Sequence, residues 1–238
     1  LRKCERKGFP SLITRLRVNA DRIYVADANE SVHFVKFSRS DQQFVLFGDD
    51  VTPRFTTSVE ILDYDTVAGG DKFGNVFVLR LPPETNDSIG HATGVRALWD
   101  HGVLNGAPNK ADTLVNFFVG EVVHSLQKAV LAPGASEVLL YSTVNGRIGA
   151  LLPFTTREDI DFFGHLEMYL RNEHVSLTGH DHLLYRSSFV PVKACVDGDL
   201  CEWFTSLPLE KQQHIAGELD RSVGEIVKKL EDMRAHVL

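Results

Sequence analysis

Short apolar and β-branched runs, separated by turn residues, follow one another along the chain up to residue 154. Runs of this kind, bounded by Gly, Pro, Asn, Asp or Ser, are typical of β-strands. They predict strands over Arg22–Ala26, Val32–Phe37, Gln43–Phe47, Ser58–Asp63, Thr66–Gly69, Val76–Arg80, Leu114–Val119, Val122–Ala129 and Val138–Tyr141, and a last hairpin that ends with Thr143–Leu152. The pattern breaks at Leu81–Ala111, an insertion that opens on Pro82 and Pro83 and leaves room for a short helix over Ala97–Leu104.

One hairpin plan occurs three times in this strand-rich part. A strand, a tight turn with Gly or Asn and a second strand can be aligned over Val25–Phe34, Gly69–Val78 and Tyr141–Ala150. In this alignment Val32, Val76 and Ile148 correspond. Val76 follows Val32 by 44 residues, the length of one four-stranded propeller blade, roughly 40–45 residues. The step from Val76 to Ile148 is longer because it contains the insertion. A unit of this size cannot bury its own apolar face, so we expect it to stack on its neighbours.

The spacing of apolar residues becomes helical after Pro153. Thr155 with Glu158, and Ser222 with Glu225, form capping-box patterns that predict two helix starts, and Pro208 predicts a third before Leu209–Leu219. The apolar stripes of the first and last helices are Ile160, Phe163, Leu166 and Leu170, and Ile226, Leu230 and Met233. The sequence therefore predicts a mainly β fold, with C-terminal blades of a WD40-like β-propeller over residues 1–154 and a small α-helical domain over residues 155–238.

Composition and charge narrow the function. The formal net charge is −7 and the chain has no run of five like charges, which argues against a broad basic face for nucleic acid. No apolar run approaches the roughly 20 residues that span a bilayer. Three cysteines without CxxC spacing fit free thiols in a reducing compartment. Because the chain starts at Leu1 rather than Met, we expect it to be a piece of a longer polypeptide.

The motifs that could carry chemistry have structural interpretations. Gly69–Gly74 lacks the GK[ST] ending of a phosphate loop, and a strand follows it. His180 and His182 could chelate zinc, but no second Cys or His pair stands at a suitable spacing, which favours a solvated loop. Asp197, beside Asp199, is better interpreted as the N-cap of a helix over Leu200–Thr205 than as a calcium ligand. No nucleophile motif is present. We expect no enzymatic activity, no cofactor and no metal.

Apolar and charged residues at loop tips are candidates for protein contacts. Pro53, Arg54 and Phe55 follow a turn that contains Asp50, and Phe73 lies at a hairpin tip. Arg and Phe on rigid loops are frequent interface anchors. The alternative is structural: Phe55 would begin an inward-facing strand and Phe73 would pack on the next blade. We expect Trp99 and Trp203 to be core residues.

Five segments carry a resemblance to a known family. They are Leu62–Gly74 (LDYDTVAGGDKFG), Leu81–Asp87 (LPPETND), Ala97–Ala107 (ALWDHGVLNGA), Val196–Glu202 (VDGDLCE) and Leu219–Arg221 with Lys228–Asp232 (LDR and KKLED). Together they resemble the C-terminal part of the splicing factor 3b subunit 3 family, across essentially the whole chain. That family belongs to a triple-propeller superfamily with the damage-specific DNA-binding protein adaptor and the large cleavage and polyadenylation subunit. Gly70, where Ala is usual, a shorter loop after Asp87 and the segment His174–Pro191 depart from the pattern.

The resemblance implies a non-catalytic scaffold of the U2 snRNP, located in the nucleus, that supports branch-site recognition. Residues 1–154 would be the last blades of a third propeller. The remaining propellers, the HEAT-repeat subunit 1, the small subunit 5 and the PHD-finger-like subunit would be partners, with RNA contact peripheral or indirect and no membrane. It also extends the contact candidates to Asp71, Lys72, Asn145 and Lys193. A ubiquitin-ligase adaptor or polyadenylation scaffold on the same fold is the alternative, and a propeller enzyme is a third class.

Overall fold

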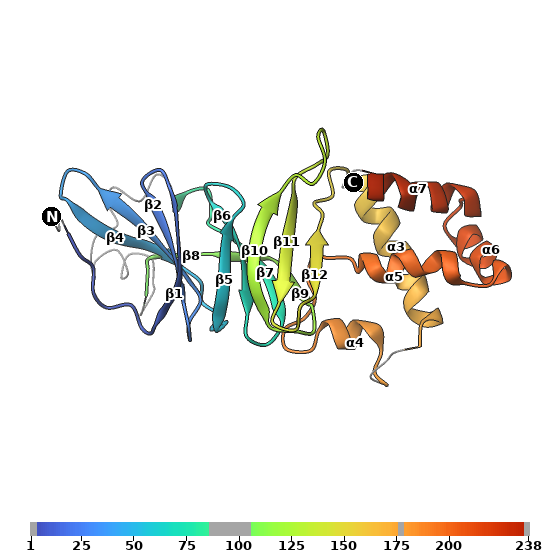
Figure 1. Ribbon diagram of the computed structural model, residues 1–238, viewed down its shortest axis with the longest axis horizontal. Coiled ribbons are helices and arrows are strands. Elements are labelled where there is room, and N and C mark those ends of the chain that lie inside the picture. Colours follow the sequence, from blue (N-terminus) through green and yellow to red (C-terminus); the bar gives the residue numbers. More distant parts are fainter. Residues whose placement is uncertain (1–3, 86–105, 176–178, 236–238) are drawn as a thin grey trace.

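Three β-sheets stand side by side along the molecule and a group of helices follows them at one end (Figure 1). The structure is a computed structural model that describes residues 4–85, 106–175 and 179–235. Trp99 and the short helix expected over Ala97–Leu104 lie outside the described residues. Among the described helices, none has the length and apolar character that crossing a bilayer requires.

The sheets are antiparallel meanders, as expected for blades. The first contains β1 (Ile13–Asn19), β2 (Arg22–Asp27), β3 (Val32–Ser38) and β4 (Gln43–Asp49), with β8 (Asn109–Lys110) added in parallel to β4. The second contains β5 (Thr56–Ile61), β6 (Thr66–Asp71), β7 (Asn75–Arg80) and β9 (Asp112–Phe118). The third contains β10 (Val123–Ala129), β11 (Val138–Thr143) and β12 (Ile148–Leu151). Each predicted strand is present within a few residues, whereas the apolar pattern predicts neither the polar, largely exposed β1 nor the two-residue β8.

The threefold hairpin repeat is confirmed at the level of register. Val32 pairs with Ala26, Val76 with Gly70 and Ile148 with Ser142, so the three aligned positions occupy the same place in their hairpins. The insertion lies between β7 and β9, which are neighbours in the second sheet. Before the chain enters β9, the end of the insertion reaches back to the first sheet through β8.

The cores lie between the sheets rather than within them. One cluster joins Tyr24 and Phe34 of the first sheet to Val67 and Phe77 of the second. A second cluster joins Val76 and Phe117 of the second sheet to Leu126, Leu139 and Tyr141 of the third sheet. Apolar side chains on both faces of β6 and β7 are therefore buried, which is the stacking that the repeat length predicts.

A separate core lies among the helices. They are α3 (Arg157–Glu173), α4 (His182–Arg186), α5 (Gly198–Glu202), the 3₁₀ helix η1 (Trp203–Ser206), α6 (Leu209–Glu218) and α7 (Val223–Ala235). The cluster shared by α3, α5, η1, α6 and α7 contains Phe163, Leu166, Leu170, Leu200, Phe204, Ile215, Ile226 and Leu230, and Trp203 and Met233 pack against it. The last strand ends at Leu151 and the first helix begins at Arg157.

Two details of the helix prediction need correction. The N-cap of α3 is Thr156, not Thr155, because the Thr156 hydroxyl accepts a hydrogen bond from the Asp159 amide. Ile160 is half exposed, so the buried stripe of α3 begins at Phe163. The second capping box is confirmed, since Ser222 and Glu225 each accept from the other's backbone N–H.

Candidate interaction surface

Two of the loop-tip candidates lie inside the molecule. The Arg54 guanidinium donates to the Asp50 carboxylate at 2.6 Å and to the Thr113 hydroxyl at 2.6 Å, and it lies over the Phe77 ring. Both charged side chains are almost fully buried. Asp50 also accepts from the Ser31 hydroxyl, so the pair fixes the β4–β5 connection between the first two sheets. An Arg beside a turn predicted a contact at the surface, and only the fold shows that the side chain at this turn points inward.

Asp71 has a structural task in the β6–β7 turn. One carboxylate oxygen accepts from the amides of Phe73 and Asn75, and the other accepts from the Asn75 side chain. Asp27 bonds the amides of Asn29 and Glu30 in the same way in the first sheet. Burial raises the pKa of Asp71, although the hydrogen bonds from Asn75 and Phe73 oppose that effect. In the first two of the three hairpins the turn is therefore built on a buried carboxylate, and in the third the Thr143 hydroxyl accepts from the Arg147 amide.

The other candidates remain on the surface. Pro53, Lys72, Phe73, Asn145 and Lys193 are exposed, and Phe55 is half-buried. Phe55 has a φ of 53° and packs edge-on against Phe73, with ring centroids 5.4 Å apart. The Lys72 ammonium lies 3.8 Å from the centroid of the Phe55 ring. The structure thus brings Phe55, Lys72 and Phe73 together, while their contact with a partner stays a prediction.

Lys193 lies on the outer edge of β9, far along the sequence from the other candidates. Its backbone N–H and C=O both bond to Asn116, and its ammonium donates to the Thr113 carbonyl. The segment before it brings Phe189 to within 4.9 Å of Phe73, measured between ring centroids. Asn145, in contrast, lies in the turn between β11 and β12 of the third sheet.

Sequence reasoning missed a buried ionic cluster that joins the helices to the second sheet. Asp197 is the N-cap of α5, as predicted, and its carboxylate also accepts from Arg186 at 2.6 Å and lies 2.8 Å from the His182 ring. Arg186 in turn donates to the Phe118 carbonyl at the end of β9. Burial alone would raise the pKa of Asp197, but hydrogen bonding to His182 and the Arg186 charge outweigh it and lower the pKa to about 2. His182 is therefore part of this cluster and not of a solvated loop.

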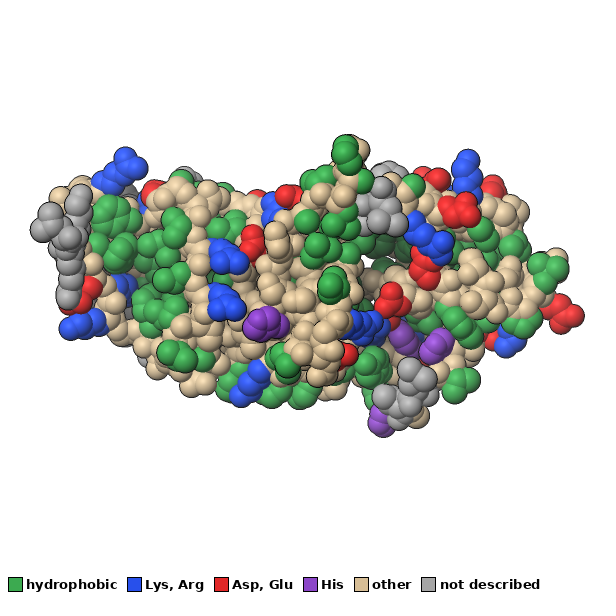
Figure 2. Space-filling model, in the orientation of Figure 1, with side chains coloured by type: hydrophobic (Ala, Val, Ile, Leu, Met, Phe, Trp, Pro, Cys, Tyr) green, Lys and Arg blue, Asp and Glu red, His purple; other side chains and the backbone are tan. Residues whose placement is uncertain are grey.

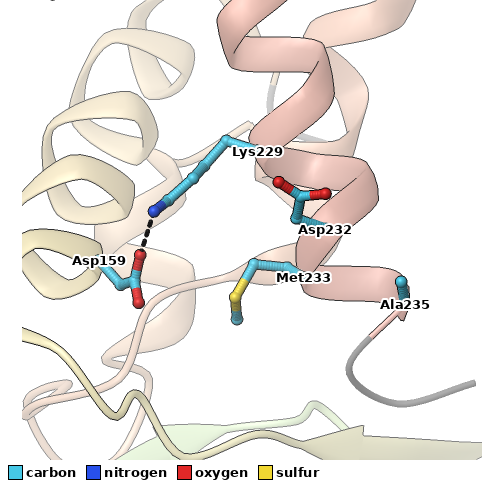
Figure 3. Close-up of a pocket in the computed structure, with 5 residues that line it drawn as sticks. All are labelled: Asp159, Lys229, Asp232, Met233 and Ala235. Atoms are coloured by element: carbon cyan, nitrogen blue, oxygen red, sulfur yellow. Dashed lines mark ion pairs between the residues drawn. The ribbon is translucent and has the colours of Figure 1, made fainter.

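The described residues offer little for catalysis. Within them, no group of three or more His, Cys, Asp or Glu side chains is arranged to hold a metal ion. Burial raises the pKa of Cys195 to about 12 and that of Cys201 further, which keeps both thiols protonated. Figure 3 shows a small hollow between α3 and α7, where Asp159 and Lys229 form an ion pair beside Asp232 and Met233. The Asp159 and Lys229 charges neutralise each other there.

The charged side chains form no basic patch on the face of the molecule that Figure 2 draws. Figure 2 shows Lys and Arg side chains scattered singly over the visible face, with acidic side chains among them. Among the described residues, many Lys and Arg side chains form ion pairs, such as Arg17 with Glu60 and Lys128 with Glu137. Rigid loops carrying aromatic residues are thus the feature of this surface that is best suited to binding.

The protein-family model described as "CPSF A subunit region" matches residues 1–206 of this chain. The chain belongs to this family. The matched residues of the CPSF A subunit region family include all three sheets and the helices up to η1, and they end before α6 and α7. The match therefore includes the ionic cluster around Asp197 and every contact candidate named above.

Curated relatives align over essentially the whole chain. The chain is 52% identical over 239 residues to "Spliceosome-associated protein 130 A" of Arabidopsis thaliana, which covers 100% of this chain and 20% of that protein. It is 50% identical over 235 residues to "Splicing factor 3B subunit 3" of Drosophila melanogaster (98% and 19%). It is 48% identical over 235 residues to "Pre-mRNA-splicing factor RSE1" of Mycosarcoma maydis (98% and 19%). The chain thus spans about one fifth of the length of these relatives, and the resemblance stated from the motifs is confirmed.

Proposed function

We propose that this chain is part of a non-catalytic scaffold subunit of the splicing factor 3b complex in the U2 snRNP, which acts in the nucleus. The observation that carries the proposal is the identity of 48–52% to three proteins that are all named as splicing or spliceosome components. On this proposal the chain supports branch-site recognition through protein contacts, and contact with RNA is peripheral.

The architecture supports a binding role. Stacked sheets with cores between them form a rigid frame, and the connections between strands present side chains at the ends of the sheets. The sheets would be the last blades of a third propeller over residues 1–154, and residues 155–238 would be a helical C-terminal domain. The partners would be the remaining propellers, the HEAT-repeat subunit 1, the small subunit 5 and the PHD-finger-like subunit.

A polyadenylation-complex scaffold or a ubiquitin-ligase adaptor is the competing function, because the same fold serves several assemblies. The family description, CPSF A subunit region, is consistent with the polyadenylation-complex scaffold. The names of the relatives favour splicing over both.

Purification of the full-length protein from nuclear extract tests the proposal. We expect U2 snRNA and the other splicing factor 3b subunits to co-purify in stoichiometric amounts. We also expect depletion of the protein to stop splicing before the branch site is engaged, and add-back to restore splicing. Co-purification with a cullin ligase or with polyadenylation factors, in place of U2 components, would overturn the proposal.

A further inference from the structure

Five aromatic rings form a continuous row where the β6–β7 turn meets the segment after α4. Phe55 packs on Phe73, Phe73 on Phe189 and Phe189 on Phe118, with centroid distances of 5.4, 4.9 and 5.9 Å, and Tyr185 completes the row against Phe118. Phe118 is buried, whereas Phe73 is 37% and Phe189 57% exposed. Phe118 and Tyr185 thus join β9 of the second sheet to α4, whereas Phe73 and Phe189 leave apolar surface in solvent. Rings in this situation are typical anchors of protein interfaces.

Lys72 lies on this row of rings. Its ammonium is 3.8 Å from the centroid of the Phe55 ring and 5.1 Å from that of Phe73. Within the described part of the chain it forms no ion pair, although Lys36, Lys110 and Lys128 each pair with a carboxylate. Contact with the ring faces is a weak interaction at an exposed site and leaves ammonium N–H groups available for an anion.

The backbone holds the first ring in place at a conformational cost. Phe55 has a left-handed φ of 53°, which is rare and strained for a bulky side chain. The amides of Arg54 and Phe55 both donate to the Glu30 carbonyl, and the Lys72 amide donates to the Phe55 carbonyl. These bonds fix the strained residue beside the β6–β7 turn, with its ring under Lys72. Strain that the surrounding structure enforces in this way is frequent at binding sites.

We propose that this aromatic–lysine row (Phe55, Lys72, Phe73 and Phe189) is a docking site for a segment of a partner protein that carries an apolar side chain next to a carboxylate. The apolar side chain packs on the exposed faces of Phe73 and Phe189, and the carboxylate pairs with Lys72. The proposal rests on the proposed scaffold function and specifies the partner's chemistry. A stacked nucleotide fits the rings less well as an occupant, because the row offers one cation, whereas strands of nucleic acid are followed by grooves with many.

Site-specific photo-crosslinking tests the occupant. The full-length protein is made with p-benzoylphenylalanine in place of Phe73, assembled into its complex, irradiated and digested, and the cross-linked peptide is sequenced. Tyr64 is the matched control, because it is 38% exposed and lies in the turn at the opposite end of β6. We expect position 73 to capture one peptide of another polypeptide with Asp or Glu within a few residues of the cross-link, and position 64 not to capture that peptide.

Charge reversal then tests the ion pair. We expect Lys72→Glu to lower the cross-linking yield at position 73 about five-fold, which corresponds to about 1 kcal/mol. Exchange of the partner's carboxylate for Lys should restore it. Lys7→Glu is the control, because the Lys7 side chain is 85% exposed and Lys7 is far from Lys72 in the sequence.

The outcomes separate this proposal from the scaffold function. A complex that assembles normally but gives a cross-link to RNA, a cross-link to a peptide without a carboxylate, or no cross-link at all overturns the docking site and leaves the scaffold function standing. Failure of the full-length protein to join the complex overturns the scaffold function itself.

Discussion

At the scale of single residues, burial decides what a charged side chain does. The sequence around Arg54 predicts an interface anchor, yet in the structure Arg54 neutralises Asp50 between two sheets. Removing one member of a buried pair costs about 3–5 kcal/mol, because the other charge stays buried. We therefore expect Arg54→Met to lower the thermal stability of the full-length protein strongly, and the double variant with Asp50→Asn to recover part of the loss. The matched control is the exposed Lys72→Met, for which an equal loss would contradict the assignment.

His33 gives stability a pH dependence at the same scale. Burial lowers its pKa below the ordinary value of 6.5, although Asp49, Asp27 and Glu30 oppose this effect. The folded state therefore binds fewer protons than the unfolded state as pH falls through 6.5, so stability is full above that pH and declines below it.

Thermal melts between pH 8 and pH 5 check this expectation. The decline should be smaller in His33→Gln than in the unsubstituted protein. It should persist in His124→Gln, because His124 is exposed. Equal declines in all three proteins would show that His33 is not the group responsible.

At the scale of elements, two turn glycines differ in what a side chain would meet: both have a positive φ, but only one is closely packed. Gly74 has a φ of 94°, and a Cβ there would lie 2.8 Å from the Glu121 amide nitrogen, whereas Gly146 has a φ of 89° with open space around it. We expect Gly146→Ala to cost about 1 kcal/mol through strain alone, and Gly74→Ala clearly more because β6–β7 must also shift. Hydrogen exchange of the amides in β7 and β12 in the full-length protein reports both effects. Equal losses would rule out the close approach as a cause.

Elements were predictable where a local pattern fixes them, and not where long-range contacts do. The hairpin repeat sets the register of β6 and β7, because Val76 and its counterpart Val32 both follow a turn built on a carboxylate. β8 forms only because the end of the insertion reaches β4, which no local pattern reports. The outward position of Phe73 was predictable from its place in a turn, whereas its contact with Phe189 joins segments more than 100 residues apart. The inward turn of Arg54 depends in the same way on the packing of two sheets.

At the scale of the whole molecule, two ion pairs of the described residues lie where the helices meet the sheets, and they differ in burial. Arg186 and Asp197 are buried, and Arg186 also donates to the Phe118 carbonyl of β9 and lies over the Phe117 ring. Arg147, in the turn before β12, pairs with Asp199 of α5, and these side chains are 39% and 78% exposed. Since the Asp197 pKa is lowered to about 2, the buried connection is complete above pH 4 and weakens only as the pH falls towards 2.

The buried pair should therefore set how firmly the helices are held. In Arg186→Met the Asp197 carboxylate loses its charge partner, and β9 loses a donor to its last carbonyl, so we expect the connection between α4 and β9 to open. Limited proteolysis of the full-length protein at neutral pH should then cut between residues 174 and 191 about ten-fold faster, while hydrogen exchange within the β2–β3 hairpin stays unchanged. Arg147→Met, which removes a solvent-screened pair, should change the cutting rate by less than two-fold. If both variants are cut at the same rate, burial of the ion pair is not what holds the helical part against the second sheet.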